Sequence, residues 1–301
     1  MEAAIEAVDL HKSYGELKAV NGLSLRIRTG EVFSLLGPNG AGKTTTIEML
    51  EGIRKPDAGT ISVLGMDPWK EEKRMHMRVG IIPQGFNFIQ RITPREGIRY
   101  FCELFGVPDR SEELLDLVDL KRVQDTYYMN LSGGQKQKFG LCLALVHDPE
   151  VIFLDEPTTG LDPQARRNMW EVIRRLQTQG KTILLTTHYL EEAQALSDRV
   201  GIVKEGRMLA EGTPAEIIAK YGRGKRLIIS ADTQLASQLR EKANGQIEQR
   251  DGTLIIQLGD GHGLAEMLRL IGNYNGKLEK IELKEDTLED VFIEMVGKVN
   301  D

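Results

Sequence analysis

The chain has 301 residues, of which 41% are hydrophobic and 28% are charged, a balance typical of globular proteins that excludes a fibrous or disordered chain. Its net charge of −6 argues against a nucleic-acid partner, because nucleic-acid binders need a basic surface to displace phosphate counterions. The length exceeds the common domain size of about 100–200 residues, and it predicts a large domain followed by a smaller one.

Neither a disulfide framework nor a membrane span is expected from the sequence. Cys102 and Cys142 are the two cysteines, and both lie in segments predicted to be helical, so we expect reduced thiols. The longest apolar runs, such as 143–146 and 151–154, fall well short of the roughly 18 residues that a bilayer requires. Residues 1–6 lack the basic and apolar regions of a secretion signal, so a cytoplasmic location is expected.

The first fifty residues contain the strongest single motif. Apolar and polar runs alternate up to residue 30, which predicts antiparallel strands. A buried strand at 31–36 then leads into a glycine-rich loop, 37–44, that fits the pattern GxxxxGK[ST], and a helix is predicted from 42 to 53. This strand–loop–helix order is the context that a phosphate-binding P-loop requires.

The P-loop predicts a nucleotide triphosphate as ligand, with Mg²⁺. Glycines let backbone N–H groups approach the phosphates, and the start of the following helix adds its positive dipole end. Lys43 is expected to reach the β- and γ-phosphates, and the hydroxyl of Thr44 is expected to bind Mg²⁺. The predicted nucleotide-binding residues of the loop are Gly37, Pro38, Asn39, Gly40, Ala41, Gly42, Lys43, Thr44 and Thr45.

Strand and helix signals alternate in the next part of the chain. Strands are predicted at 79–82, 151–154, 182–186 and 200–203, with an amphipathic helix at 164–177 and a mostly helical insert at about 93–145. This alternation predicts an α/β core, a mostly parallel sheet with helices on both faces.

An acidic pair follows the strand at 151–154. Asp155 is expected to emerge at the carboxyl end of the strand, where open α/β sheets bind ligands, and to hold Mg²⁺ through water. Glu156 is predicted to orient or deprotonate the water that attacks the γ-phosphate. The structural alternative, a helix-start or turn role for the pair, is less favoured beside a P-loop.

A third motif, Leu131-Ser132-Gly133-Gly134-Gln135, lies between the P-loop and the acidic pair. The ordered trio resembles the ATP-binding cassette (ABC) family over about residues 5–215, and implies an ATP hydrolase. In that family this signature segment closes over ATP held by a second cassette. Ser132, Gly133, Gly134 and Gln135 are therefore expected to bind ATP across a homodimer, or a pair of cassettes.

The resemblance also gives roles to four less specific positions. Gln84 resembles the glutamine that reaches Mg²⁺ and the attacking water, and His188 resembles the switch histidine that contacts the γ-phosphate. Tyr14 resembles the aromatic residue that stacks on adenine, although a packing role is the alternative. Asp162 resembles an aspartate between the two sites of the dimer, which is compatible with capping the next helix.

The small C-terminal domain is predicted to start near a glycine-containing basic segment at 221–225. The domain limits are 1–221 and 222–301, and Arg223, Lys225 and Arg226 are interpreted as a solvated linker. Strands at 226–230, 246–250, 253–258 and 277–284, with helices at 232–243 and 263–271, give a βαββαβ order, followed by a last helix at 287–297. This order is typical of a ferredoxin-like α+β fold.

The closing segment, 283–295, resembles the end of export ATPases of the daunorubicin-resistance type. The lack of sustained heptads between Lys43 and Leu131 argues against the coiled-coil relatives that act on chromosomes. The chain is therefore predicted to be the ATPase of an exporter that drives separate membrane permease subunits, peripheral on the inner face of the cell membrane. The alternatives are an importer ATPase or a soluble ABC ATPase without a transport role.

Overall fold

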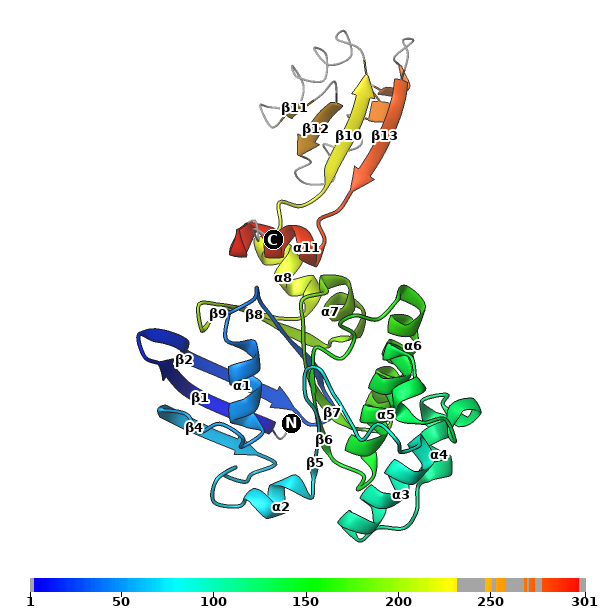
Figure 1. Cartoon of the computed structure of the whole chain (residues 1–301). Helices are drawn as coiled ribbons and strands as arrows, with labels where there is room; N and C mark the ends of the chain where they lie inside the picture. Colours follow the sequence, from blue (N-terminus) through cyan, green and yellow to red (C-terminus); the bar gives the residue numbers. More distant parts are fainter. Residues whose placement is uncertain are drawn as a thin grey trace. The chain divides into compact units, whose positions relative to one another are not determined.

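The computed structural model describes residues 3–231, 247–250, 253–257, 268–269, 271–273 and 278–297. The chain forms two compact units, one that ends at Pro214 and one that starts at Ala215 (Figure 1). The domain limits expected from the sequence stay predictions. Within the described ranges, no helix combines the length and the apolar character needed to cross a bilayer.

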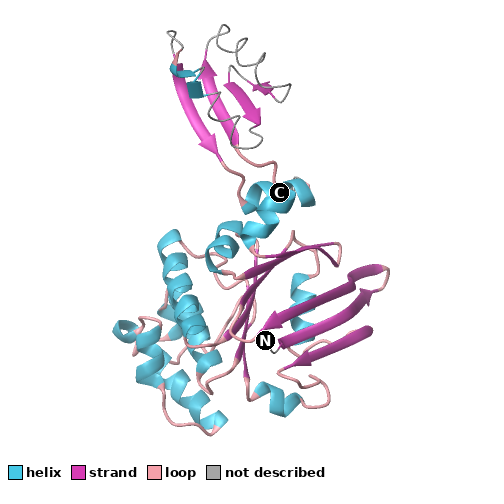
Figure 2. Cartoon of the chain, turned by 180° about the vertical axis from the view of Figure 1, so that it is seen from behind, coloured by secondary structure: helices cyan, strands magenta, loops and turns pink. Residues whose placement is uncertain are grey.

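A six-stranded sheet forms the centre of the first unit (Figure 2). Its strands are β3 (Val32–Leu36), β5 (Val79–Ile82), β6 (Val151–Asp155), β7 (Thr182–Thr187), β8 (Arg199–Lys204) and β9 (Arg207–Gly212). In space they follow the order β5-β6-β7-β3-β8-β9, and all neighbours are parallel except β8 and β9. Strands β3, β6 and β7 are buried along their whole length, as parallel strands with both faces covered must be.

A separate antiparallel sheet is formed by β1 (Ala3–Tyr14), β2 (Leu17–Arg28) and β4 (Ala58–Val63), in the order β2-β1-β4. Leu23, Leu25 and Ile27 of β2 are buried, and the residues between them are exposed. This period of two is that of a strand with one face on the core. The antiparallel strands predicted ahead of the P-loop are thereby confirmed.

Seven α-helices of the first unit surround these sheets in the described part of the chain. They are α1 (Lys43–Leu50), α2 (Glu72–His76), α3 (Pro94–Phe105), α4 (Ser111–Leu117), α5 (Gly133–Leu145), α6 (Pro163–Thr178) and α7 (Leu190–Leu196). Short 3₁₀ turns lie at Lys121–Val123 and Tyr128–Asn130. Helices α3 and α5 each begin with a capping box, Thr93 with Glu96 and Ser132 with Gln135, which explains where the insert turns helical.

Different elements cover the two faces of the central sheet. Ile152 and Leu154 of β6 belong to a core shared with α3, α4, α5 and α6. Val151 and Phe153 of the same strand belong to a core shared with α1 and the antiparallel sheet. Because neighbouring side chains of a strand point to opposite faces, α1 and α5 lie on opposite sides of the central sheet (Figure 1).

The second unit contains a four-stranded antiparallel sheet. Its elements are α8 (Pro214–Tyr221), β10 (Arg226–Ala231), β11 (Ile247–Arg250), β12 (Thr253–Gln257), β13 (Leu278–Lys284) and α11 (Leu288–Val296). The spatial order β11-β12-β10-β13 is that of the ferredoxin-like arrangement expected from the sequence. The predicted helix at 232–243 lies outside the described residues, as does most of the one at 263–271.

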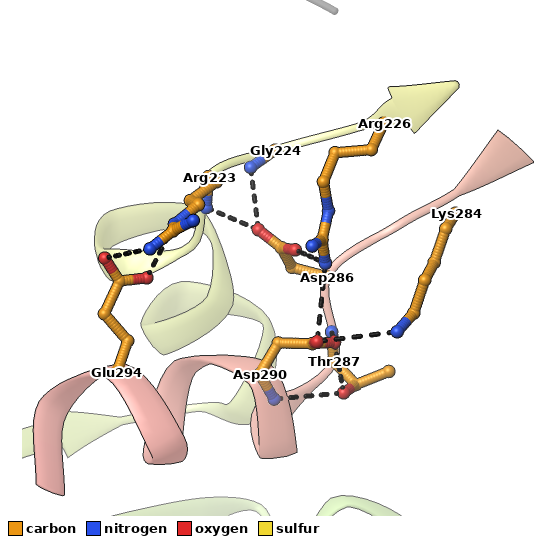
Figure 3. Close-up of polar contacts among 8 residues, drawn as sticks. All are labelled: Arg223, Gly224, Arg226, Lys284, Asp286, Thr287, Asp290 and Glu294. Atoms are coloured by element: carbon orange, nitrogen blue, oxygen red, sulfur yellow. Dashed lines mark hydrogen bonds and ion pairs between the residues drawn. The ribbon is translucent and has the colours of Figure 1, made fainter. Parts of the chain in front are cut away.

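A buried carboxylate organises the point where β10 begins and α11 follows β13 (Figure 3). Asp286, which is 8% exposed, accepts hydrogen bonds from the backbone N–H groups of Arg223 and Gly224 and pairs with Arg226 at 2.5 Å. Arg223 pairs with Glu294 of α11 at 3.2 Å. The interpretation of these basic residues as a solvated linker is wrong for Arg226, whose side chain is 19% exposed and bound within the second unit.

We expect Asp286→Ala to destabilise the second unit by about 2–4 kcal/mol, because it removes a buried carboxylate that two backbone N–H groups and the Arg226 guanidinium share as acceptor. Hydrogen exchange of peptides from β10 and α11 measures this loss. The matched control is Glu285→Ala, since Glu285 and Lys225 form an exposed pair, 64% and 58% accessible, worth less than about 1 kcal/mol. Equal protection in the two variants would contradict the role given to Asp286.

Candidate active site

Four parallel strands bring the predicted catalytic segments to one edge of the central sheet. The P-loop follows β3, Gln84 follows β5, the pair Asp155 and Glu156 ends β6, and His188 follows β7. These strands are neighbours in the order β5-β6-β7-β3, and their carboxyl ends share one edge because they are parallel. That edge is where open α/β sheets bind ligands.

The backbone of the P-loop requires glycine at its tight points. Gly42, at the N-cap of α1, has φ 98°, and a Cβ atom there would lie 2.1 Å from the carbonyl oxygen of Ala19. A Cβ on Gly37 would lie 2.5 Å from the carbonyl oxygen of Val203. No side chain caps α1, and its first turn carries no acidic residue. The N–H groups of that turn, which have no intrahelical acceptor, therefore form a cradle that fits a phosphate anion.

Lys43 is held over this loop. Its side chain is 6% exposed, and its Nζ donates to the carbonyl oxygens of Gly37 at 2.8 Å and Pro38 at 3.2 Å. Burial lowers the pKa of Lys43, and the negative charges of Glu156 and Asp155 partly oppose this. Lys43 thus places a positive charge near the loop and the two carboxylates. This charge would neutralise part of the negative charge of a bound phosphate.

Asp155 is a buried carboxylate beside Thr44. Asp155 is 4% exposed, and it accepts hydrogen bonds from the hydroxyl groups of Thr186 and Thr44. Burial raises the pKa of Asp155, although these hydrogen bonds lower it. A carboxylate and a hydroxyl oxygen next to a phosphate cradle are hard oxygen ligands that fit Mg²⁺. The roles of both residues in metal binding stay predictions.

Glu156 gathers the other predicted catalytic residues around one carboxylate oxygen. Its Oε2 lies 3.2 Å from Nε2 of Gln84, 2.9 Å from Oγ1 of Thr159 and 3.3 Å from Nδ1 of His188. The backbone at Glu156 has φ 50°, a strained value for a residue with a side chain, and its N–H is held by Oγ1 of Thr186 at 3.0 Å. Strain kept by specific partners is typical of functional sites.

The signature segment lies away from the P-loop, on the other face of the sheet. Ser132 caps α5, and Ser132 and Gly133 are exposed. A Cβ on Gly134 would lie 3.0 Å from the Cβ of Ala165, so the signature packs against the first turn of α6. Asp162 caps that helix by accepting from the N–H of Ala165 at 2.8 Å. The signature and Asp162 thus share one side of the unit, and this chain does not bring them to its own P-loop.

Tyr14 lies at the end of β1 and is 40% exposed. The guanidinium of Arg54 stands over its ring, 5.2 Å from the centroid, and Arg54 donates to Glu48 of α1 at 2.6 Å. The ring therefore lies near the helix that begins at the P-loop, with part of its surface open. Stacking on adenine stays a prediction.

The other predicted P-loop residues differ in accessibility. Asn39 and Gly40 are exposed, Pro38 and Thr45 are half-buried, and Ala41 is buried, with its N–H bonded to the carbonyl oxygen of Pro38 at 3.1 Å. The exposed tip of the loop is the part that a ligand could contact from solvent.

The structure adds residues that sequence reasoning missed. Thr186 binds both Asp155 and the N–H of Glu156, and Thr159 binds the carboxylate of Glu156. Two threonines that directly follow the apolar run 183–185 were a usable signal for the first. Glu51, at the end of α1 and 3% exposed, has an Oε1 atom without a hydrogen-bond partner among the described residues. No sequence pattern pointed to it.

Comparison with protein families gives two matches that together span most of the chain. Residues 20–159 match the family described as ABC transporter, and residues 212–296 match the family described as ATP-binding protein DrrA1-3-like, C-terminal domain. The Nod factor export ATP-binding protein I of Rhizobium sp. (strain N33) is 38% identical over 303 residues, which cover 99% of this chain and 98% of that protein. The protein of the same name from Paraburkholderia xenovorans (strain LB400) is 48% identical over 223 residues, 72% of this chain and 73% of that protein.

Solved structures agree with these matches. An ATP-binding subunit of an ABC transporter is 29% identical with a TM-score of 0.66, covering 73% of this chain and 93% of that one. A dimeric ATP-binding cassette in a post-hydrolysis state, bound to ADP and Pi, is 25% identical with a TM-score of 0.62, covering 69% and 98%. The predicted P-loop ATPase core is thereby confirmed.

The buried carboxyl of Glu51 makes the stability of the first unit depend on pH. Burial, with the negative charges of Asp155 and Glu48, raises its pKa from 4.5 to about 8. The folded state therefore holds this proton more tightly than the unfolded state, and stability is lost as pH rises from about 4.5 to about 8. We expect Glu51→Gln to raise the Tm of the first unit at pH 8 and to change it little at pH 5.

Thermal unfolding at the two pH values measures this difference. Glu72→Gln, at an exposed position of α2, is the matched control and should leave Tm unchanged at both. A gain for Glu51→Gln of the same size at pH 5 and pH 8 would contradict the raised pKa.

Proposed function

Because this chain belongs to the family of ABC transporter ATP-binding proteins and is an ATP hydrolase with a DrrA-like C-terminal domain, we propose that it powers an exporter. Two copies would close on two ATP molecules and drive separately encoded membrane subunits from the inner face of the membrane. Each ATP would lie between the P-loop of one copy and the signature segment of the other.

The observation that carries this proposal is the separation of the two ATP-binding segments. The P-loop helix α1 and the signature helix α5 pack on opposite faces of the central sheet. A single copy can therefore surround only one side of a triphosphate. Ser132 and Gly133 are exposed at the start of α5, where backbone N–H groups can meet phosphate oxygens held by another copy.

The residues around β6 support hydrolysis. Thr44 and Asp155 would hold Mg²⁺, and Lys43 would neutralise charge on the phosphates. When bound, Mg²⁺ supplies the positive charge that stabilises a phosphoryl group in transfer. Glu156 would accept a proton from the attacking water, and Gln84 and His188 would hold its carboxylate in place.

Export is supported by the relatives and by the tail. The protein from Rhizobium that matches along 98% of its length is named for the export of Nod factors. The second unit matches the C-terminal domain of DrrA1-3-like proteins. The membrane subunits, which carry the path for the exported molecule, would select it.

An exposed apolar surface fits the contact with those subunits. Tyr100 and Leu104, one turn apart on α3, are 54% and 65% exposed. Ile89 and Met129 are 61% and 51% exposed, and their segments are joined by a hydrogen bond from the N–H of Met129 to the carbonyl oxygen of Gln90. Ile89 lies five residues after Gln84 in the sequence. Exposed apolar side chains that form a contiguous patch mark protein contact sites, and we propose that these residues form one.

We expect Glu156→Gln to bind Mg-ATP and to lose hydrolysis by about 100-fold or more, because the amide cannot accept the proton of the attacking water. With Mg-ATP the variant should form a stable dimer, measured by light scattering together with phosphate release. Glu150→Gln is the control, since Glu150 pairs with Arg78 away from the predicted site. Hydrolysis by Glu156→Gln at the rate of this control would rule out the role of Glu156.

We expect the tagged Glu156→Gln chain, purified from its native membranes in detergent with Mg-ATP, to carry a stoichiometric membrane-spanning protein. Adding Leu104→Glu should remove that protein, because a charge would enter an apolar contact. Adding Leu209→Glu, at an exposed position of β9, should not. Equal recovery with both additions would contradict the proposed docking surface, and mass spectrometry identifies the recovered protein.

A further inference from the structure

Side chains of α6 contact Tyr189, the N-cap residue of α7, and Glu192 within α7. Arg166 and Trp170 lie four residues apart on α6 and therefore share one face of the helix. The guanidinium of Arg166 lies 3.8 Å from the centroid of the Tyr189 ring, and Nε1 of Trp170 donates to Oε1 of Glu192 at 2.9 Å. Glu192 is fully buried, so its contact with Trp170 fixes the two helices against each other.

The ring of Tyr189 also lies against His188. The two ring centroids are 4.1 Å apart, and the rings are tilted by 40°. The His188 side chain is 40% exposed, and an exposed side chain samples several rotamers unless packing restricts it. The Tyr189 ring supplies such packing. Nδ1 of the same imidazole lies 3.3 Å from Oε2 of Glu156.

Arg166 contacts the Tyr189 ring through a cation–π interaction, and it forms no ion pair with a carboxylate in the part of the chain that the structure describes. Its Nε atom is buried and has no hydrogen-bond partner among the described residues. Burial raises the pKa of Glu192, and the positive charge of Arg166 partly opposes this. The guanidinium itself stands over the aromatic face of Tyr189. A cation at this distance over a ring is attracted by the ring quadrupole, most strongly where water is excluded.

We propose that Arg166 and Tyr189 are positioning residues for hydrolysis, which restrict the His188 side chain to the orientation in which it contacts Glu156. This inference rests on the proposed role of His188. Asp162 caps the start of α6, on the side of the unit where the signature lies, so the stack also ties that side to His188. A shift of α6 when a second copy binds would then reach the catalytic carboxylate through Tyr189.

The test separates positioning from binding and from folding. Tyr189→Leu and Arg166→Gln should each lower kcat about tenfold and change the KM for ATP less than about twofold, because the stack orients a catalytic group and leaves the P-loop intact. Tyr189→Phe, which keeps the ring, should recover most of the lost kcat. Tyr221→Leu is the matched control, since Lys220 lies over the Tyr221 ring at 5.0 Å on α8, in the second unit.

The His188→Ala background distinguishes the outcomes. If the stack acts through His188, Tyr189→Leu should lower kcat no further in that background, whereas a general loss of structure would lower it again. A Tyr189→Leu chain with full kcat, or one with additive loss beside His188→Ala, overturns the inference. Full kcat in His188→Ala alone instead refutes the proposed role of His188, so the two failures are separable.

Discussion

The parallel pairing of β5, β6, β7 and β3 is the constraint on which the rest of the structure depends. Parallel strands end at one edge, so residues far apart in the sequence must meet there: Gln84, Asp155, Glu156 and His188 follow three different strands. The buried apolar runs of β3, β6 and β7 set that pairing, since they need cover on both faces. The same cover places α1 and α5 on opposite sides, and it divides the predicted ATP-binding residues between two surfaces.

The charged groups at this edge of the sheet are disfavoured by burial and stabilised by each other and by a few hydrogen bonds. Lys43 and Asp155 are nearly inaccessible, and burial opposes the charged form of each. Each favours the other's charge, and Thr186 and Thr44 donate to the carboxylate. A bound triphosphate with a divalent cation would add charges of both signs to a site already arranged for them.

The sequence predicted the features that depend on neighbours in the chain. The P-loop and the alternation in β2 are local patterns, and the strand order of the second unit followed from the order of its elements. Contacts between segments that are distant in the chain could not be predicted from the sequence. Asp286 binds Arg226 across 60 positions, and the partners of Glu156 come from 3 to 72 positions away. Composition made the basic segment near 223 look solvated, because its acidic partners, at 285–294, lie far from it in the sequence.

A structure of the Glu156→Gln chain with Mg-ATP tests the central claim most directly, the sharing of each ATP between two copies. We expect two chains related by a twofold axis, with the γ-phosphate of each ATP between Lys43 of one chain and Ser132 of the other. A structure in which ATP is bound by the P-loop while the signature of every copy faces solvent, or contacts a different surface, would contradict it.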